Sequence, residues 1–265
     1  MKLRVTCDLS FQVDKTSALI LMLRPYRGSG QTLTQEIYTI TPFLTMIEHH
    51  DDYGNGCQRL LVPSGFFSIH TVAEVMVAHQ VNIAWGAPFV EIQYLPKEVL
   101  HYLAPSRYCE SDRFNELATR IVGDALPGYD QVVRIVNWIQ QHIEYVPGSG
   151  DVPLSAEEIH EQGYGVCRDL AHLGIALCRS ISLPARIVVG YLHNLVPMDL
   201  HAWFEVYVGY DWYSFDPTQS SVIGGRVIIA FGRDAADVSI FHQFGSGCQL
   251  TDMKVQVQCL DEGIG

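Results

Sequence analysis

The apolar residues of this 265-residue chain change their spacing about 100 residues from the start, and this change constrains the fold more than any other feature. Before that point, short apolar runs alternate with turn signals. Such a pattern predicts an antiparallel β domain over residues 1–100. The runs are LRVTCDLSFQV, ALILMLRP, EIYTI, RLLVP and HTVAEVMVAHQVNI, with the turn DDYGNG before the fourth.

Residues 101–265 form the second predicted domain, and it begins with helical spacing. Apolar residues recur three or four apart within 114–122 and again within 133–139. Ser155 stands three residues before Glu158, which is the spacing of a capping box and predicts a short helix ending near Gly163. A longer amphipathic helix is predicted from GYGVC through RDLAHLGIALCRSI.

Strands follow the helices in this second domain. Helices followed by sequential strands favour an α+β fold with an antiparallel sheet over alternating βαβ units. The five predicted strands are ARIVVGYL, HAWFEVYV, WYSFDP, RVIIAF and MKVQVQCL.

The charge and cysteine content narrow the class of protein. Seventeen basic against 29 acidic residues, with no cluster of Lys and Arg, argue against nucleic acid as a partner. The N-terminal MKLRVTCDLSFQVD lacks the apolar core of a signal peptide, and no stretch approaches the roughly 20 apolar residues of a membrane helix. Seven cysteines without a CxxC pair fit reduced thiols. We therefore expect a cytoplasmic protein that binds no membrane.

Cys167 is the first candidate functional residue, because it follows two glycines at the predicted first turn of the long helix. Unpaired N–H groups and the positive end of the helix dipole favour an anion there. A cysteine in such a place, or beside an imidazolium, becomes a thiolate nucleophile at neutral pH. Cys178 lies in the body of the same helix, so we expect it to be an ordinary core residue.

A thiolate enzyme needs a proton-transfer partner, and the strand HAWFEVYV offers His201. If Gly209 and Tyr210 form a two-residue type II′ turn, the strand pairing places Asp216 diagonally beside His201, within reach of its imidazole. A one-residue slip would send Asp216 to the other face. His172 and His193 remain less favoured alternatives for the base.

The remaining motifs predict neither a metal nor a cofactor. The histidines of the first half have no spaced Cys, His or Glu companions. DDYGNG has Tyr53 where a calcium loop needs Asp or Asn and has no Glu at the twelfth position, and GYGVCR lacks the third glycine of a dinucleotide fingerprint.

Three segments together resemble the core of bacterial transglutaminase-like proteins: GYGVCRDLAHLGIALCRSISLPARIVVGYL, HAWFEVYVGYDWYSFDPTQ and GRDAADV. That superfamily includes transglutaminases, peptide N-glycanases and proteins classed as cysteine proteases. The likeness covers about residues 110–240, and GQTL, IYTITP and DDYGN look like the β domain that often precedes this core. The resemblance implies a papain-like core of helices packed on an antiparallel sheet, preceded by a sandwich-like β domain.

The resemblance also implies site roles. Cys167 in GVCRD would be the nucleophile, His201 in HAW the general base and acid, and Asp216 in DPT the orienting carboxylate. The Cys167 N–H and one upstream side chain, either Trp138 or Tyr145, would hold the oxyanion. The implied chemistry is acyl transfer from an amide of a protein or peptide substrate through a thioester. Hydrolysis is favoured, while a transglutaminase and an inactive binding module remain alternatives.

Overall fold

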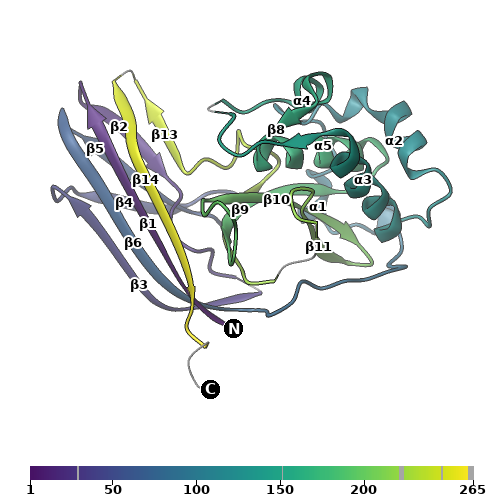
Figure 1. The fold of residues 1–265 in the computed structure, drawn as a ribbon, viewed down its shortest axis with the longest axis horizontal. Coiled ribbons are helices and arrows are strands. Elements are labelled where there is room, and N and C mark those ends of the chain that lie inside the picture. Colours follow the sequence, from purple (N-terminus) through teal and green to yellow (C-terminus); the bar gives the residue numbers. More distant parts are fainter. Residues whose placement is uncertain (29, 151, 221–223, 246, 262–265) are drawn as a thin grey trace.

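The chain folds into a β-sandwich beside a four-stranded sheet, and helices cover one face of that sheet (Figure 1). This arrangement is seen in a computed structural model that describes residues 1–265 except 29, 151, 221–223, 246 and 262–265. The predicted α+β class, with antiparallel sheets and a β-rich first part, is confirmed.

The β-sandwich consists of two four-stranded antiparallel sheets in the orders β14-β1-β6-β3 and β13-β2-β5-β4. Alternate residues of β1 are buried from Leu3 to Val13, as expected for a strand with one face on a core. The strands are β1 (Lys2–Val13), β2 (Ser17–Leu21), β3 (Gln31–Thr41), β4 (Met46–His50), β5 (Gly56–Val62), β6 (Gly65–Val77), β13 (Phe241–Phe244) and β14 (Cys248–Cys259).

Strand β14 corrects one prediction, because its MKVQVQC segment does not join the sheet of the second domain. It runs along β1 from Leu3↔Cys259 to Val13↔Cys248, and Figure 1 shows the yellow strand beside the purple one. Local alternation identifies a strand but not its partner, and the long edge of β1 would otherwise expose unpaired backbone groups. The domain boundary near residue 100 stays a prediction.

A separate four-stranded sheet, outside the sandwich, has the order β11-β10-β9-β12, and helix α5 packs across it. Gly174 of α5 allows close packing, since a Cβ there would lie 2.6 Å from the Phe204 ring of β10. The elements before the sheet are α1 (Lys97–Leu100), α2 (Asn115–Val122), α3 (Tyr129–His142), β7 (Glu144–Tyr145), α4 (Ala156–Gln162), β8 (Tyr164–Gly165) and α5 (Cys167–Ser180), with short 3₁₀ turns at Ile92–Tyr94 and Ser111–Arg113. Its strands are β9 (Ala185–Leu192), β10 (His201–Val208), β11 (Asp211–Phe215) and β12 (Arg226–Gly232).

The predicted capping box starts α4. The Ser155 hydroxyl accepts from the Glu158 N–H at 3.4 Å, and the Glu158 carboxylate accepts from the Ser155 N–H at 2.8 Å. The helix ends at Gly163, whose φ of 81° is left-handed. The following strand β8 pairs with β7 and leads directly into α5.

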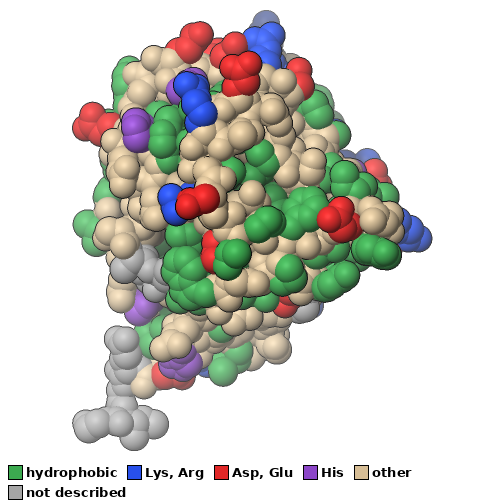
Figure 2. All heavy atoms as spheres, turned by 90° about the vertical axis from the view of Figure 1, so that its right-hand side faces the viewer, with side chains coloured by type: hydrophobic (Ala, Val, Ile, Leu, Met, Phe, Trp, Pro, Cys, Tyr) green, Lys and Arg blue, Asp and Glu red, His purple; other side chains and the backbone are tan. Residues whose placement is uncertain are grey.

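The outer surface on the helical side carries isolated charges. Figure 2 shows Lys and Arg side chains scattered among apolar and uncharged groups, with acidic side chains between them. Within the described residues, no helix combines the length and the apolar character needed to cross a membrane.

Candidate active site

Cys167 is the first residue of α5, as the glycine-rich approach predicted, and it is half-buried. The buried Asp169 holds this helix start in place. Its carboxylate accepts from the backbone N–H of Val166 at 3.3 Å and of Leu154 at 3.1 Å, and from Arg168 Nε at 3.0 Å. Cys167 therefore lies at the positive end of the α5 dipole, which favours a negative charge on its side chain.

His201 is the first residue of β10, and a tight hairpin brings Asp216 to it. The register Val208↔Asp211 through Phe204↔Phe215 is the one that the two-residue turn predicts. The turn itself is type I′ instead of type II′, because Tyr210 as well as Gly209 has a positive φ. Both turns have two central residues, so the register is unaffected. His201 Nε2 and Asp216 Oδ2 lie 2.8 Å apart.

Asp216 is buried and held by three further contacts. The Thr218 hydroxyl donates to Oδ1 at 2.7 Å and the Thr218 N–H to the same atom at 3.1 Å, while Arg226 Nη2 donates to Oδ2 at 3.5 Å. Burial alone would raise the pKa of Asp216, but the hydrogen bond and charge of His201, with Arg226 and Thr218, hold it below its usual range. Asp216 is therefore a stable carboxylate.

The surroundings of His201 favour the protonated, positively charged imidazole. Burial lowers its pKa, but hydrogen bonding with Asp216 and Cys167, together with the negative charges of both groups, outweighs burial and raises the pKa to about 9. Among the described residues, its Nδ1 has no hydrogen-bond partner although it is buried. Nε2 is thus occupied by Asp216, and the other ring nitrogen is open for proton exchange.

Cys167 and His201 line one cavity of about 920 Å³. Its walls are mostly apolar and come from residues 145–150, Pro153, the start of α5, β9, the segment before β10, residues 235–241, which reach the first residue of β13, and β14. The apolar lining includes Leu195, Met198, Leu200, Ile240, Phe241, Leu250 and Met253. The β-sandwich therefore forms one wall of the cleft, which the sequence did not indicate.

The two predicted oxyanion candidates lie in different places. Tyr145 borders the cavity, and burial together with the charge of Cys167 raises the pKa of its hydroxyl, which stays a neutral donor. Trp138 lies on α3, where its ring stacks on His142 with centroids 4.5 Å apart. Trp138 is not among the described residues that line the cavity.

The alternative bases have other contacts. His172 is fully buried, with Nδ1 2.8 Å from the Leu154 carbonyl oxygen and Nε2 accepting from the Ala235 N–H at 3.2 Å. Burial lowers its pKa, so the ring is neutral. His193 does not line the cavity in the described part of the chain. Cys178 is fully buried, and burial raises the pKa of its thiol.

Three residues at the site were not predicted. Thr218 could have been found, since Asp-Pro-Thr allows the aspartate to accept from the backbone and hydroxyl two residues on. Asp169 could have been found from its position in the first helical turn. Arg226 has no local signal, because a connection of nine residues separates it from Asp216. Within the described residues, no three His, Cys, Asp or Glu side chains are grouped to hold a metal ion.

The chain is similar to known proteins over this site and beyond it. A family model described as the transglutaminase-like superfamily matches residues 115–217. The crystal structure of a "putative cysteine protease" from Cytophaga hutchinsonii superimposes with a TM-score of 0.92 at 34% identity, covering 100% of this chain and 92% of that one. An uncharacterized protein of Mycobacterium leprae (strain TN) is 35% identical over 136 residues, and the chain spans about half the length of that curated relative, 48%.

Proposed function

Since this chain belongs to the transglutaminase-like superfamily, we propose that it is a cysteine hydrolase that cleaves amide bonds in a protein or peptide. One observation carries the proposal: His201 is hydrogen-bonded to a buried carboxylate through Nε2 and shares a cavity with Cys167 at a helix start. This is the arrangement in which a base is oriented by a third group and activates a nucleophile.

The proposed reaction begins with Cys167 and His201 as a thiolate and an imidazolium. The sulfur attacks the amide carbonyl carbon, and the carbonyl oxygen becomes an oxyanion that accepts from the Cys167 N–H and the Tyr145 hydroxyl. The C–N bond then breaks as the imidazolium Nδ1 gives its proton to the departing amine. A thioester on Cys167 and a neutral imidazole remain.

Hydrolysis completes the proposed cycle. His201 takes a proton from water, the resulting hydroxide attacks the thioester carbonyl, and the bond between the acyl carbon and Sγ of Cys167 breaks to release a carboxylic acid and restore the thiolate. Asp216 stabilises the imidazolium in both steps without changing its own protonation. The relative from Cytophaga hutchinsonii, named as a protease, supports water over a second amine as the acceptor.

The cleft supports a polypeptide substrate with bulky apolar side chains. Its lining is mostly apolar, and polar side chains such as Arg168, Asp199 and Ser239 interrupt it at only a few places. The seven cysteines of the described chain are free thiols, which fits an enzyme of the reducing cytoplasm.

The experiment is an incubation of the purified protein with a peptide library, with and without an added primary amine, followed by mass spectrometry. We expect new carboxyl termini in both samples. Cys167→Ala should abolish product while the circular dichroism spectrum stays unchanged, and Cys178→Ala, on the same helix, should keep turnover. Amine adducts as the main product would replace hydrolysis with amine transfer. Equal turnover by Cys167→Ala and the parent would overturn the proposal.

A substrate-free measurement tests the nucleophile separately. Cys167 should react with iodoacetamide below pH 7 much faster than Cys178, because it lies at a helix start beside His201 whereas Cys178 is buried. Peptide mapping after a timed reaction distinguishes the two thiols. Equal and slow alkylation of both would contradict an activated nucleophile and favour an inactive binding module.

A further inference from the structure

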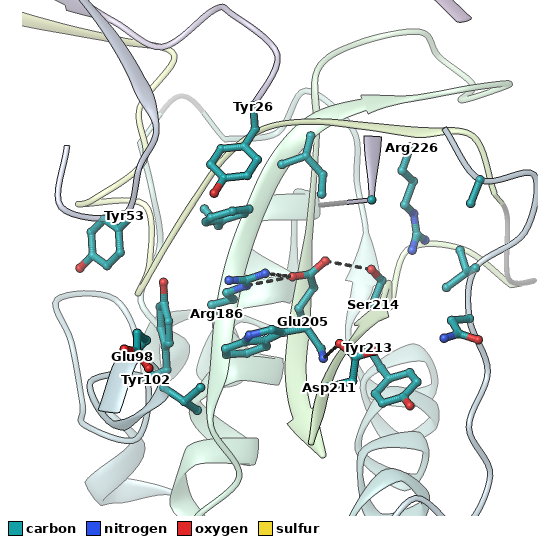
Figure 3. Close-up of a pocket in the computed structure, with 18 of the residues that line it drawn as sticks. Tyr26, Tyr53, Glu98, Tyr102, Arg186, Glu205, Asp211, Tyr213, Ser214 and Arg226 are labelled. Atoms are coloured by element: carbon teal, nitrogen blue, oxygen red, sulfur yellow. Dashed lines mark hydrogen bonds and ion pairs between the residues drawn. The ribbon is translucent and has the colours of Figure 1, made fainter. Parts of the chain in front are cut away.

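Two cavities of the molecule are lined by charged side chains, and they differ in whether those charges are paired. In the smaller cavity, of about 710 Å³, Glu205 binds Arg186 at 2.7 Å and accepts from the Ser214 hydroxyl at 3.2 Å (Figure 3). This ion pair needs no ligand. The larger cavity, which contains Cys167 and His201, also holds a carboxylate, and that carboxylate is not paired.

The unpaired carboxylate is that of Asp199, which lines the cleft two residues before His201. Its Oδ1 accepts from the Leu200 N–H at 2.7 Å. Among the described residues, no Lys or Arg forms an ion pair with Asp199, and no donor reaches its Oδ2. One oxygen of a negatively charged group therefore remains available in the cleft.

The other charges of the cleft compensate one another. Arg168 donates to the buried Asp169 at 3.0 Å, so this pair is neutral. The thiolate of Cys167 balances the imidazolium of His201, and the carboxylate that orients the histidine has an arginine of β12 as a second positive neighbour. Within the described part of the chain, Asp199 is thus the lining charge that lacks a counter-charge.

The position of Asp199 allows it to act on a bound substrate. The residue is exposed at the cleft, yet partial burial of its carboxylate raises the pKa, and its neighbours Met198 and Leu200 add apolar lining. A carboxylate that is partly removed from water gains more from a nearby cation than a fully solvated one does. The charge of His201 lowers the pKa of Asp199, and the charge of Asp199 raises that of Tyr145, so the carboxylate lies near the reacting groups.

We propose that Asp199 selects the substrate by binding a positively charged group of the peptide close to the amide that Cys167 attacks. This inference rests on the proposed function, because it assigns a substrate class to the same cleft. The recognised chemistry is an ammonium or guanidinium group beside apolar side chains. A Lys or Arg side chain and a free N-terminal amine both supply such a cation, and the experiment distinguishes these two sources.

Four matched peptides test the charge preference. They are acetyl-Leu-Ala-Lys-Ala-Leu-amide, the same peptide with norleucine or Glu in place of Lys, and the norleucine peptide with a free N-terminus. We expect kcat/KM for the Lys peptide or the free-amine peptide to exceed that of the acetylated norleucine peptide about fivefold or more, with the Glu peptide slowest. An advantage of the Lys peptide assigns the side chain, and an advantage of the free-amine peptide assigns the N-terminus. Equal kcat/KM for all four would overturn the proposal.

Matched variants locate the preference. Asp199→Asn should reduce the ratio of kcat/KM between the preferred cationic peptide and the acetylated norleucine peptide to about one, and Asp199→Lys should favour the Glu peptide. Asp252→Asn removes the same charge from an exposed residue of β14 that is not among the described residues lining the cleft, and it should keep the parent's ratio. A fall of the same factor for every peptide in Asp199→Asn would leave the ratio unchanged. That result would overturn the proposal, because Asp199 would then act on His201 instead of on the substrate.

Binding separates this inference from the proposed hydrolysis. Calorimetry of the four peptides with Cys167→Ala, and with the same variant carrying Asp199→Asn, measures charge selection without turnover. Tighter binding of a cationic peptide that is lost in the double variant would support the role of Asp199 even if no peptide were cleaved, and the absence of cleavage would then contradict hydrolysis alone. Equal binding of all four peptides, a preference that persists in the double variant, or no saturable binding of any peptide would overturn the role of Asp199.

Discussion

Strand β10 carries two buried ion pairs, one at its first residue and one in its middle, and the two pairs are built differently. At one end His201 meets Asp216 at 2.8 Å, with the side chains 0% and 2% exposed. Four residues on, Glu205 meets Arg186 at 2.7 Å, with side chains 8% and 15% exposed. Distance and burial therefore do not distinguish a candidate active site from a structural pair.

The two pairs differ in whether any of their hydrogen-bonding atoms remains without a partner. Glu205 uses both oxygens, one for Arg186 and one for Ser214, and aromatic rings cover the guanidinium. In the His201 pair, Nδ1 is buried and has no partner in the described part of the chain. A pair with every atom used stabilises the fold, whereas an open nitrogen beside a thiol in a cleft can exchange a proton.

The largest expected effect comes from removing the open nitrogen. His201→Ala should lower the turnover of a cleavable peptide about 10³-fold, because the leaving amine loses its proton donor. Iodoacetamide should also alkylate Cys167 more slowly below neutral pH, since the imidazolium no longer stabilises the thiolate. Peptide turnover and timed alkylation of the variant measure these effects. An alkylation profile identical to that of the parent would contradict an ion pair between His201 and Cys167.

The carboxylates of the two pairs give the next test. Asp216→Asn should lower turnover about 10²-fold, because the imidazolium loses its buried counter-charge, and should lower it less than His201→Ala does. Glu205→Gln should leave turnover within a few-fold of the parent but lower the free energy of unfolding by about 3 kcal/mol, since Arg186 remains buried and unpaired.

Turnover should therefore fall mainly in Asp216→Asn, and the free energy of unfolding measured with urea should fall in Glu205→Gln without a comparable loss of turnover. If Glu205→Gln lost as much activity as Asp216→Asn, the distinction between a structural and a functional pair on β10 would fail.

The candidate site was predictable because short-range rules connect its parts. A helix start determines where Cys167 lies. A two-residue turn determines the register of β10 and β11 up to Phe204↔Phe215, so the position of Asp216, one residue past β11, follows by counting. The predicted turn type was wrong, but the predicted strand register was still correct, since register depends on the number of residues in the turn. The α4 capping box was equally local.

Contacts between distant segments were not predictable in the same way. Strand β14 pairs with β1 across almost the whole chain, and β13 and β14 supply a wall of the cleft. Arg226 reaches Asp216 from a different strand, through a connection whose path no turn motif encodes. Alternation and propensity report which residues are buried, but they do not report which surface buries them.

The pKa of His201 predicts that both the stability and the turnover of the protein depend on pH. The folded-state pKa, about 9, lies above the ordinary value of 6.5, so the stabilisation is complete below pH 6.5 and is lost as the pH rises through 9. The free energy of unfolding should fall by up to roughly 3 kcal/mol over this range. Turnover should decline over the same alkaline limb as the imidazolium loses its proton.

Urea unfolding between pH 6 and pH 10 measures this decline. His201→Gln should flatten the curve between 6.5 and 9, while Glu205→Gln, which keeps His201, should retain the decline from a lower starting value. A decline of the same size in His201→Gln would assign the pH dependence to another group.

The smallest effects come from the two hydroxyl groups that support the carboxylates. Thr218 donates to Asp216 at 2.7 Å and Ser214 donates to Glu205 at 3.2 Å. Loss of either hydrogen bond should cost about 1 kcal/mol. For Ser214→Ala the loss should appear only in the free energy of unfolding, because Glu205 has no contact with the reacting groups. For Thr218→Val it should appear also as a several-fold fall in turnover, because the orientation of Asp216 sets that of His201. Equal turnover by the two variants would show that the backbone N–H of Thr218 and the His201 bond are sufficient to orient the carboxylate.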